Sequence, residues 1–150
     1  TPNIIALFET TGLVAPDAVL RSSNGVIDAS GIVVSGLVDA QGTGVTLVAP
    51  AAMRALARAT AGDVAITAGG DLAVDANATG GVALTSSGGN VAVGDAQAGG
   101  RMDIAAAQDI AIARSATAGG ALALTAGRLV TIGGAALGQT VDLRAADLAI

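Results

Sequence analysis

Residues 62–74 read Gly-Asp-Val-Ala-Ile-Thr-Ala-Gly-Gly-Asp-Leu-Ala-Val, and the chain repeats this pattern as far as residue 150. Each repeat holds two short segments in which apolar residues flank a small or polar one. Such alternation is typical of a β-strand with one buried face. The first segments carry the apolar pairs Val64 and Ile66, Val82 and Leu84, Met102 and Ile104, Leu122 and Leu124, and Val141 and Leu143. The second segments carry Leu72 and Val74, Val91 and Val93, Ile110 and Ile112, Val130 and Ile132, and Leu148 and Ile150.

The spacing of these segments is nearly constant. In both series, each segment follows the last after about 18 to 20 residues, a fixed period that indicates a solenoid in which each repeat forms one rung. The sequence therefore predicts an all-β fold, a right-handed parallel β-helix (β-solenoid) with about 19 residues per rung. Roughly eight rungs at the strand spacing of about 4.8 Å would make a rod on the order of 40 Å long.

A β-sandwich is the alternative, because many short strands joined by turns also suit that fold. A sandwich built as a meander needs a hairpin turn at every junction. Dipeptides of that type are scarce here, and paired glycines recur instead, as at Gly69-Gly70 and Gly80-Gly81. The constant period also stacks first segments on first segments, which favours the solenoid.

Residues 1–61 follow the period less regularly. Leu7, Val26, Val45 and Val64 succeed one another at the interval of about 19 residues that the later repeats show. We therefore expect residues 1–61 to form irregular N-terminal rungs of the same solenoid, and residues 62–150 to form regular two-strand repeats. Together they would make one continuous domain, which we expect to be a fragment of a longer chain.

Two N-terminal segments have alternative interpretations. Asn24-Gly25 suits a type I′ hairpin turn, but the period runs through it and favours a corner between two solenoid strands. Residues 50–61 suit a short helix that begins at Pro50 and ends at Gly62. Met53 lies one period before Leu72, in register with the second segments, which favours a strand and a corner instead.

Glycines separate the strands that we expect at 32–34, 37–38 and 45–47. Glycine tolerates a positive φ, which turns often require. On this basis we expect turns at Gly31, Gly36, Gly42 and Gly44.

The composition limits both the core and the partners. Apolar residues make up 52% of the chain but aromatic residues only 1%, so the core must be thin and filled by Val, Leu, Ile and Ala. The net charge is −5, which argues against nucleic acid as a partner, since that requires a basic surface. No apolar run approaches the roughly 18 residues of a spanning helix, so we expect no membrane insertion.

The chain has few groups for catalysis. It contains no His, Cys, Lys or Tyr, so acid–base chemistry would fall to Asp, Glu9 or Arg. A polysaccharide-active β-helix enzyme would use outward acidic residues, here Asp63, Asp71, Asp75, Asp103, Asp109, Asp142 and Asp147. Solvated acidic turns explain the same residues more simply. We therefore expect no enzyme, no catalytic residue and no cofactor.

Metal and modification motifs are incomplete. The double glycines lack the third glycine of the calcium-binding nonapeptide repeat, so no metal site is predicted, although stacked corner Asp residues leave calcium open. Asn77-Ala78-Thr79 has the form of a glycosylation sequon, which chance explains. Outward threonines at 46, 67, 85 and 125 are too scattered for a regular ice-binding row.

The middle residues of the second segments are small. If these segments stack, they form a strip that either packs against another layer or reflects an alanine-rich composition. The strip consists of Ala73, Ala92, Ala111, Thr131 and Ala149.

The repeats at 62–74, 80–93 and 119–132 resemble those of filamentous haemagglutinin-type exoproteins, which bacteria secrete by a two-partner route. Residues 62–150 match this pattern well and residues 1–61 loosely. The resemblance implies a right-handed β-helix shaft on the bacterial cell surface, with a role in adhesion, biofilm formation or a toxin stalk. It transfers no catalytic residue.

Three function classes follow. The first is a secreted structural shaft or adhesive segment, whose partners are neighbouring rungs or copies stacked end to end into filaments, with a host-cell or glycan receptor as a further partner. The second is a carbohydrate- or receptor-binding module. The third is the polysaccharide-active enzyme. The sequence favours the first.

Overall fold

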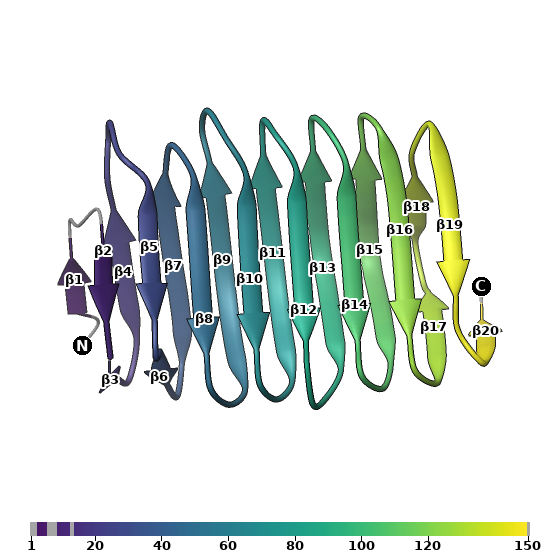
Figure 1. Cartoon of the computed structure of the whole chain (residues 1–150), viewed down its shortest axis with the longest axis horizontal. Coiled ribbons are helices and arrows are strands. Elements are labelled where there is room, and N and C mark those ends of the chain that lie inside the picture. Colours follow the sequence, from purple (N-terminus) through teal and green to yellow (C-terminus); the bar gives the residue numbers. More distant parts are fainter. Residues whose placement is uncertain (1–2, 6–8, 13, 150) are drawn as a thin grey trace.

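The computed structural model describes residues 3–5, 9–12 and 14–149, and the strands in them form one coil (Figure 1). Every regular element of these residues is a β-strand, and every strand pair is parallel. Parallel pairing throughout confirms the solenoid and rules out the meander for the described residues, because consecutive strands of a meander pair in antiparallel fashion.

The strands form two large sheets and one small one. Sheet A has ten strands, ordered β1 (Asn3–Ile5), β4 (Ala18–Arg21), β7 (Leu37–Gly42), β9 (Met53–Ala59), β11 (Leu72–Ala78), β13 (Val91–Ala98), β15 (Ile110–Ala118), β17 (Leu129–Ile132) and β20 (Asp147–Ala149), with β18 (Ala135–Leu137) also beside β15. Sheet B has eight, ordered β19 (Thr140–Arg144), β16 (Ala121–Ala126), β14 (Met102–Ala106), β12 (Val82–Ser86), β10 (Val64–Ala68), β8 (Val45–Ala49), β5 (Ile27–Ser30) and β2 (Glu9–Thr11). The small sheet pairs β3 (Val14–Ala15) with β6 (Val33–Val34).

The chain passes from one large sheet to the other in each turn of the coil. In Figure 1 the strands of sheet B, nearer the viewer, run downwards, those of sheet A run upwards, and the chain advances from left to right, so the coil is right-handed. About seven turns connect the eight strands of sheet B, which agrees with the roughly eight rungs expected.

The register of the regular rungs is the one that the apolar pairs predict. Val64 pairs with Val82, and this row of apolar residues continues in sheet B to the last strand, β19. Leu72 pairs with Val91, and that row continues in sheet A to β20. Like residues therefore stack on like residues.

The prediction for the earlier rungs is wrong by one residue. Val45 pairs with Val64 as expected, but Ile27 rather than Val26 pairs with Val45. Val26 is 48% exposed, whereas Ile27 is 2% exposed. The step from Ile27 to Val45 is one residue shorter than the expected period, and shifting a strand by one residue exchanges its two faces. Leu7, the next residue of the expected row, lies outside the described residues.

The two ambiguous N-terminal segments form a corner and a strand. Gly25 lies between β4 of sheet A and β5 of sheet B, which do not pair with each other, so the hairpin alternative is wrong. Residues 53–59 form β9, whose Met53 pairs with Leu72 as expected. Strands at 33–34, 37–42 and 45–49 confirm the three expected between the glycines.

Of the four glycines at which turns were expected, only Gly31 has a positive φ. Its φ is 66°, whereas Gly36, Gly42 and Gly44 have no positive φ. At Gly36 the constraint is space, because a Cβ would overlap the Asp17 carboxylate and the Pro16 carbonyl oxygen of the rung before. Close approach of successive rungs, rather than an unusual backbone angle, therefore requires that glycine.

The core between the sheets is aliphatic and narrow. The five strands of sheet B from β8 to β16 each bury two large residues and then a small one, as in Val64, Ile66 and Ala68. The longer strands of sheet A also bury alanines, as at Ala76 and Ala78 in β11. Small residues before a turn thus face large residues after it, which fills a thin core without aromatic rings. In the described residues, no helix is long and apolar enough to cross a membrane.

Candidate ligand-binding surface

One hollow of the described surface lies on the outer face of sheet A. It has a volume of about 560 Å³ and crosses the second halves of six strands, β4, β7, β9, β11, β13 and β15. Its floor includes Ala57, Ala76 and Ala96, whose buried side chains point into the core. We call this hollow the sheet A groove.

Two irregularities in strand pairing precede the groove. The register between β11 and β13 shifts after Val74, where β13 contains Gly94 as an extra residue. The register between β13 and β15 shifts after Val93 in the same way. Such bulges bend a strand and redirect its side chains. The groove lies over the residues that follow these bulges, beyond the regular apolar pairs of sheet A.

A row of polar side chains runs through the groove along the axis of the coil. Each member pairs with the next across adjacent strands, so the row presents one polar side chain per rung. The amide of Asn77 donates to the side-chain oxygen of Gln97 at 3.5 Å. We call it the polar row; its members are Arg21, Gln41, Arg58, Asn77, Gln97 and Thr117.

Charged side chains in and beside the polar row are mostly paired. Arg21 bonds Asp39 at 2.9 Å. Arg114 lies 2.7 Å from a carboxylate oxygen of Asp95 and 3.6 Å from one of Asp75. Among the described residues, no ion pair involves Arg58, whose guanidinium therefore keeps its donors for water or a ligand.

Several of the outward acidic residues accept hydrogen bonds from the following rung. Oδ1 of Asp63 accepts the N–H of Gly81 at 2.6 Å, and each bond of this kind joins one rung to the next. Oδ1 of Asp71 accepts the main-chain N–H of Asn90 at 2.9 Å. Oδ1 of Asp75 accepts the main-chain N–H of Asp95 at 2.8 Å. In the part of the chain that the structure describes, no three acidic residues lie close enough together to hold a metal ion.

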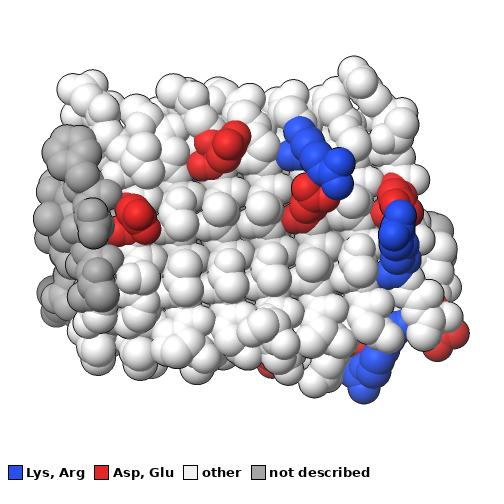
Figure 2. All heavy atoms as spheres, viewed as in Figure 1, with Lys and Arg blue, Asp and Glu red and all other residues white. Residues whose placement is uncertain are grey.

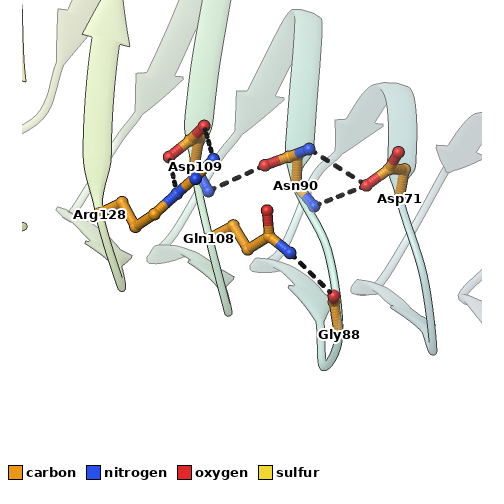
Figure 3. Close-up of polar contacts among 6 residues, drawn as sticks. All are labelled: Asp71, Gly88, Asn90, Gln108, Asp109 and Arg128. Carbon is orange, nitrogen blue, oxygen red and sulfur yellow. Dashed lines mark hydrogen bonds and ion pairs between the residues drawn. The ribbon is translucent and has the colours of Figure 1, made fainter.

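Figure 3 shows how these bonds continue along one corner of the coil. Asn90 donates both its main-chain and its side-chain N–H to Asp71, and its own Oδ1 accepts the N–H of Asp109 at 3.1 Å. Arg128 of the following rung then binds Asp109 with two bonds of 3.1 and 2.7 Å. The corner side chains therefore connect four successive rungs.

The remaining acidic residues on the surface mainly meet arginines. Asp103 pairs with Arg101 at 2.7 Å, and Asp142 pairs with Arg144 at 2.9 Å. These carboxylates raise the pKa of both guanidinium groups. The hydrogen bond is the larger cause, and the attraction between opposite charges is the smaller one. Asp109 raises the pKa of Arg128 for the same two reasons. Exposed pairs of this kind contribute little stability.

The last predicted acidic residue, Asp147, is exposed, and its main-chain N–H donates to the carbonyl of Arg128.

The outer face of sheet B carries few charges. Figure 2 shows this face, on which charged side chains are isolated or paired and uncharged residues cover most of the area. Thr67 pairs with Thr85, and the same row continues through Ala105 to Thr125. Three of the four outward threonines thus share one row and are less scattered than their spacing in the sequence suggests. The fourth, Thr46, lies outside that row, since Val48 pairs with Thr67.

The small residues of the second segments stack as expected. Ala73, Ala92, Ala111, Thr131 and Ala149 pair in register across sheet A. Most of them line another hollow of about 450 Å³, to which Arg54 and Leu37 also contribute. The small side chains of this strip therefore lie in a hollow of the outer face of sheet A.

Sequence reasoning missed two polar features. Ser86 is 3% exposed, donates to the Gly70 carbonyl at 2.5 Å and accepts the N–H of Gly89 at 3.0 Å. The other feature is the polar row. One rung forward from Asn77 lies Gln97, and the same step again leads to Thr117. The repeat period therefore also applies to these polar residues, and the apolar pairs alone do not reveal the polar row.

Comparison with known proteins gives no family assignment. No protein-family model, no curated protein and no solved structure matches this chain. Functional inference therefore rests on the solenoid and on its surfaces.

Proposed function

We propose that this chain is a structural shaft segment of a large secreted bacterial surface protein of the filamentous haemagglutinin type. The observation that carries the proposal is the unbroken stacking of equivalent apolar residues in both large sheets. In such a stack each rung contacts mainly its neighbours, so adding rungs lengthens the rod without altering its cross-section. The resemblance of the repeats at 62–74, 80–93 and 119–132 supports the same family.

The mechanism of a shaft is geometric. Main-chain bonds between parallel strands and stacked aliphatic side chains hold each rung to the next, and the corner bonds of Asp63, Asp71 and Asp75 add to them. The rod would carry adhesive surfaces away from the cell and would join neighbouring rungs or further copies end to end. We propose no enzymatic activity and no cofactor, because the carboxylates beside the groove are held in ion pairs with Arg21 and Arg114.

Duplicating one rung tests the shaft. Residues 82–101 form one rung, since Val82 pairs with Met102. A second copy inserted after residue 101 should leave the protein folded and lengthen it by about 4.8 Å in solution scattering, the spacing of one strand. Loss of cooperative folding, or an unchanged length, would contradict the shaft.

Location needs its own experiment. An antibody against this segment should label intact cells of the producing bacterium. Labelling should disappear when the outer-membrane transporter of the two-partner route is removed. Labelling only after cell lysis would contradict surface exposure while leaving the rod geometry untouched.

A further inference from the structure

We propose that the sheet A groove binds an extended, uncharged polysaccharide that lies along the axis of the coil. The proposal adds a ligand to the shaft but does not rest on it, because the groove belongs to the fold whether or not the protein is secreted. It is carried by the polar row, the shape of the groove and the charge balance around it.

The polar row offers hydrogen-bonding groups at a regular spacing. Neighbouring strands lie roughly 4.8 Å apart, which is close to the length of one sugar ring in an extended glycan. The groove spans β4 to β15, so six rungs each present one side chain of the row to the groove. Amide and hydroxyl groups both donate and accept, as sugar hydroxyls do, so each ring could bond one rung.

The shape of the groove suits an elongated ligand. It extends along the axis across six strands, and Leu56, which is 42% exposed, stands between Asp39 and Asp75 in the neighbouring row. Beneath it lie buried alanines, whose small side chains leave the hollow of about 560 Å³. An aliphatic side chain beside polar groups matches the apolar face and polar edge of a sugar ring.

The charges around the groove favour a neutral chain. Two guanidinium groups, those of Arg21 and Arg58, line the groove together with three carboxylates. A third guanidinium, that of Arg114, pairs with two of these carboxylates, so the charges in and beside the groove sum to zero. An acidic polysaccharide would gain one free guanidinium, that of Arg58, but would meet Asp39, Asp75 and Asp95. A neutral polysaccharide meets no such repulsion.

Two other classes of ligand fit less well. An extended peptide usually adds to the edge of a sheet, whereas the groove lies on the face of central strands whose main-chain groups already bond their neighbours. Nucleic acid requires a basic surface and commonly aromatic rings for stacking, and the chain has a net charge of −5 and 1% aromatic residues.

Calorimetric titration of the protein with neutral oligosaccharides tests the proposal. The probes are hexasaccharides of β-1,4-linked glucose, mannose and N-acetylglucosamine, with the matching disaccharides and a hexasaccharide of galacturonic acid. At least one neutral hexasaccharide should bind, and at least about tenfold more tightly than its disaccharide, because only the longer chain reaches several rungs. The acidic hexasaccharide should bind more weakly.

Matched variants assign the binding to the groove. The double variant Asn77→Ala with Gln97→Ala should weaken binding at least about tenfold, as expected when two hydrogen-bonding groups are lost. The control, Thr67→Ala with Thr85→Ala on sheet B, should bind like the original protein. Both should show the circular dichroism and melting temperature of a folded chain, since all four side chains lie on outer faces.

Three results would overturn the inference. They are no binding of any neutral hexasaccharide, tighter binding of the acidic one, and binding that the groove variants leave unchanged. None of these results bears on the rod, which the rung duplication tests independently.

Discussion

Oδ1 of Asp75 accepts the main-chain N–H of Asp95, 20 residues further along the chain, at 2.8 Å. The residue before Asp95 is Gly94, and a Cβ at that position would overlap the same carboxylate oxygen. The missing side chain of one rung therefore makes room for the acceptor of the rung before.

This relationship recurs along the coil. Asp17, Asp63 and Asp71 each accept an N–H from the following rung, and a glycine precedes the donor each time. Those glycines are Gly36, Gly80 and Gly89. An aspartate in one rung and a glycine in the next thus act as one unit that fixes how successive rungs meet.

The first prediction concerns that unit. Gly94→Ala should lower the free energy of unfolding by about 1–3 kcal/mol, because the new Cβ displaces the Asp75 carboxylate from its hydrogen bond. Gly100→Ala is the control, since its Cβ would meet its nearest atoms at an ordinary 3.6 Å. Denaturant unfolding of both variants provides the comparison.

The two residues should also be coupled. In the background of Asp75→Ala, the same Gly94→Ala change should cost much less, because the displaced group is already absent. Equal costs in both backgrounds would show that the carboxylate is not what the glycine accommodates.

The second prediction separates two kinds of aspartate. Asp71→Ala should lower the free energy of unfolding by about 0.5–1.5 kcal/mol, because Asp71 accepts two hydrogen bonds from Asn90. Asp103→Ala removes only an exposed pair with Arg101, for which roughly 0.2–1 kcal/mol is expected. About 1 M salt should abolish most of the second loss but little of the first. A similar salt dependence for both would refute the distinction.

The third prediction concerns the buried hydroxyl. Alanine occupies the positions that pair with Ser86 in the adjacent strands, Ala68 and Ala106, so the repeat alone would suggest that Ser86→Ala is harmless. The structure predicts a loss of about 1–3 kcal/mol, because the N–H of Gly89 loses its partner in a buried corner. Thermal unfolding decides between the two, and a stabilised variant would show that the bond contributes nothing.

The fourth prediction concerns the alanines of the core. Ala96→Leu should destabilise the protein by about 1–3 kcal/mol, because Ala96 is 1% exposed and the core there is too narrow for a larger side chain. Ala92→Leu makes the same change on the outer face of the same strand, β13, and should be nearly neutral. Equal free energies of unfolding for the two variants would show that the core beside Ala96 can accommodate a larger side chain.

Particular residues show how much of the fold could be predicted from the sequence. The apolar pairs such as Val64 and Ile66 predicted the rungs, because a strand that buries one face must alternate and a solenoid must stack equivalent positions. The same reasoning failed at Val26, where a step one residue shorter than the usual period moved Ile27 into the row. The period alone does not show which of two adjacent apolar residues, Val26 or Ile27, faces the core, because both are hydrophobic enough to occupy the buried position.

The candidate site was less accessible to sequence reasoning. The polar row uses residues that look like ordinary surface positions, and the bulge beside Gly94 shifts their register by one residue. The acidic residues drew attention as possible catalysts, whereas most of them accept bonds from the next rung or pair with arginine. The interaction that each of these acidic residues makes depends on which glycine or arginine lies beside it in the next rung of the coil.

The sequence by itself determined the class of fold, the period and the composition of the core, because these follow from alternation and from the scarcity of aromatic residues. Tertiary structure decided which glycine makes room for which carboxylate, where sheet A is hollow, and that Ser86 is satisfied within its corner. Each of these depends on contacts between residues about 16 to 20 positions apart, and a deviation of one residue in a rung changes them. The alternation of apolar residues along the chain specifies the strands of each rung. The contacts between stacked rungs determine the hollows and hydrogen bonds of the surface.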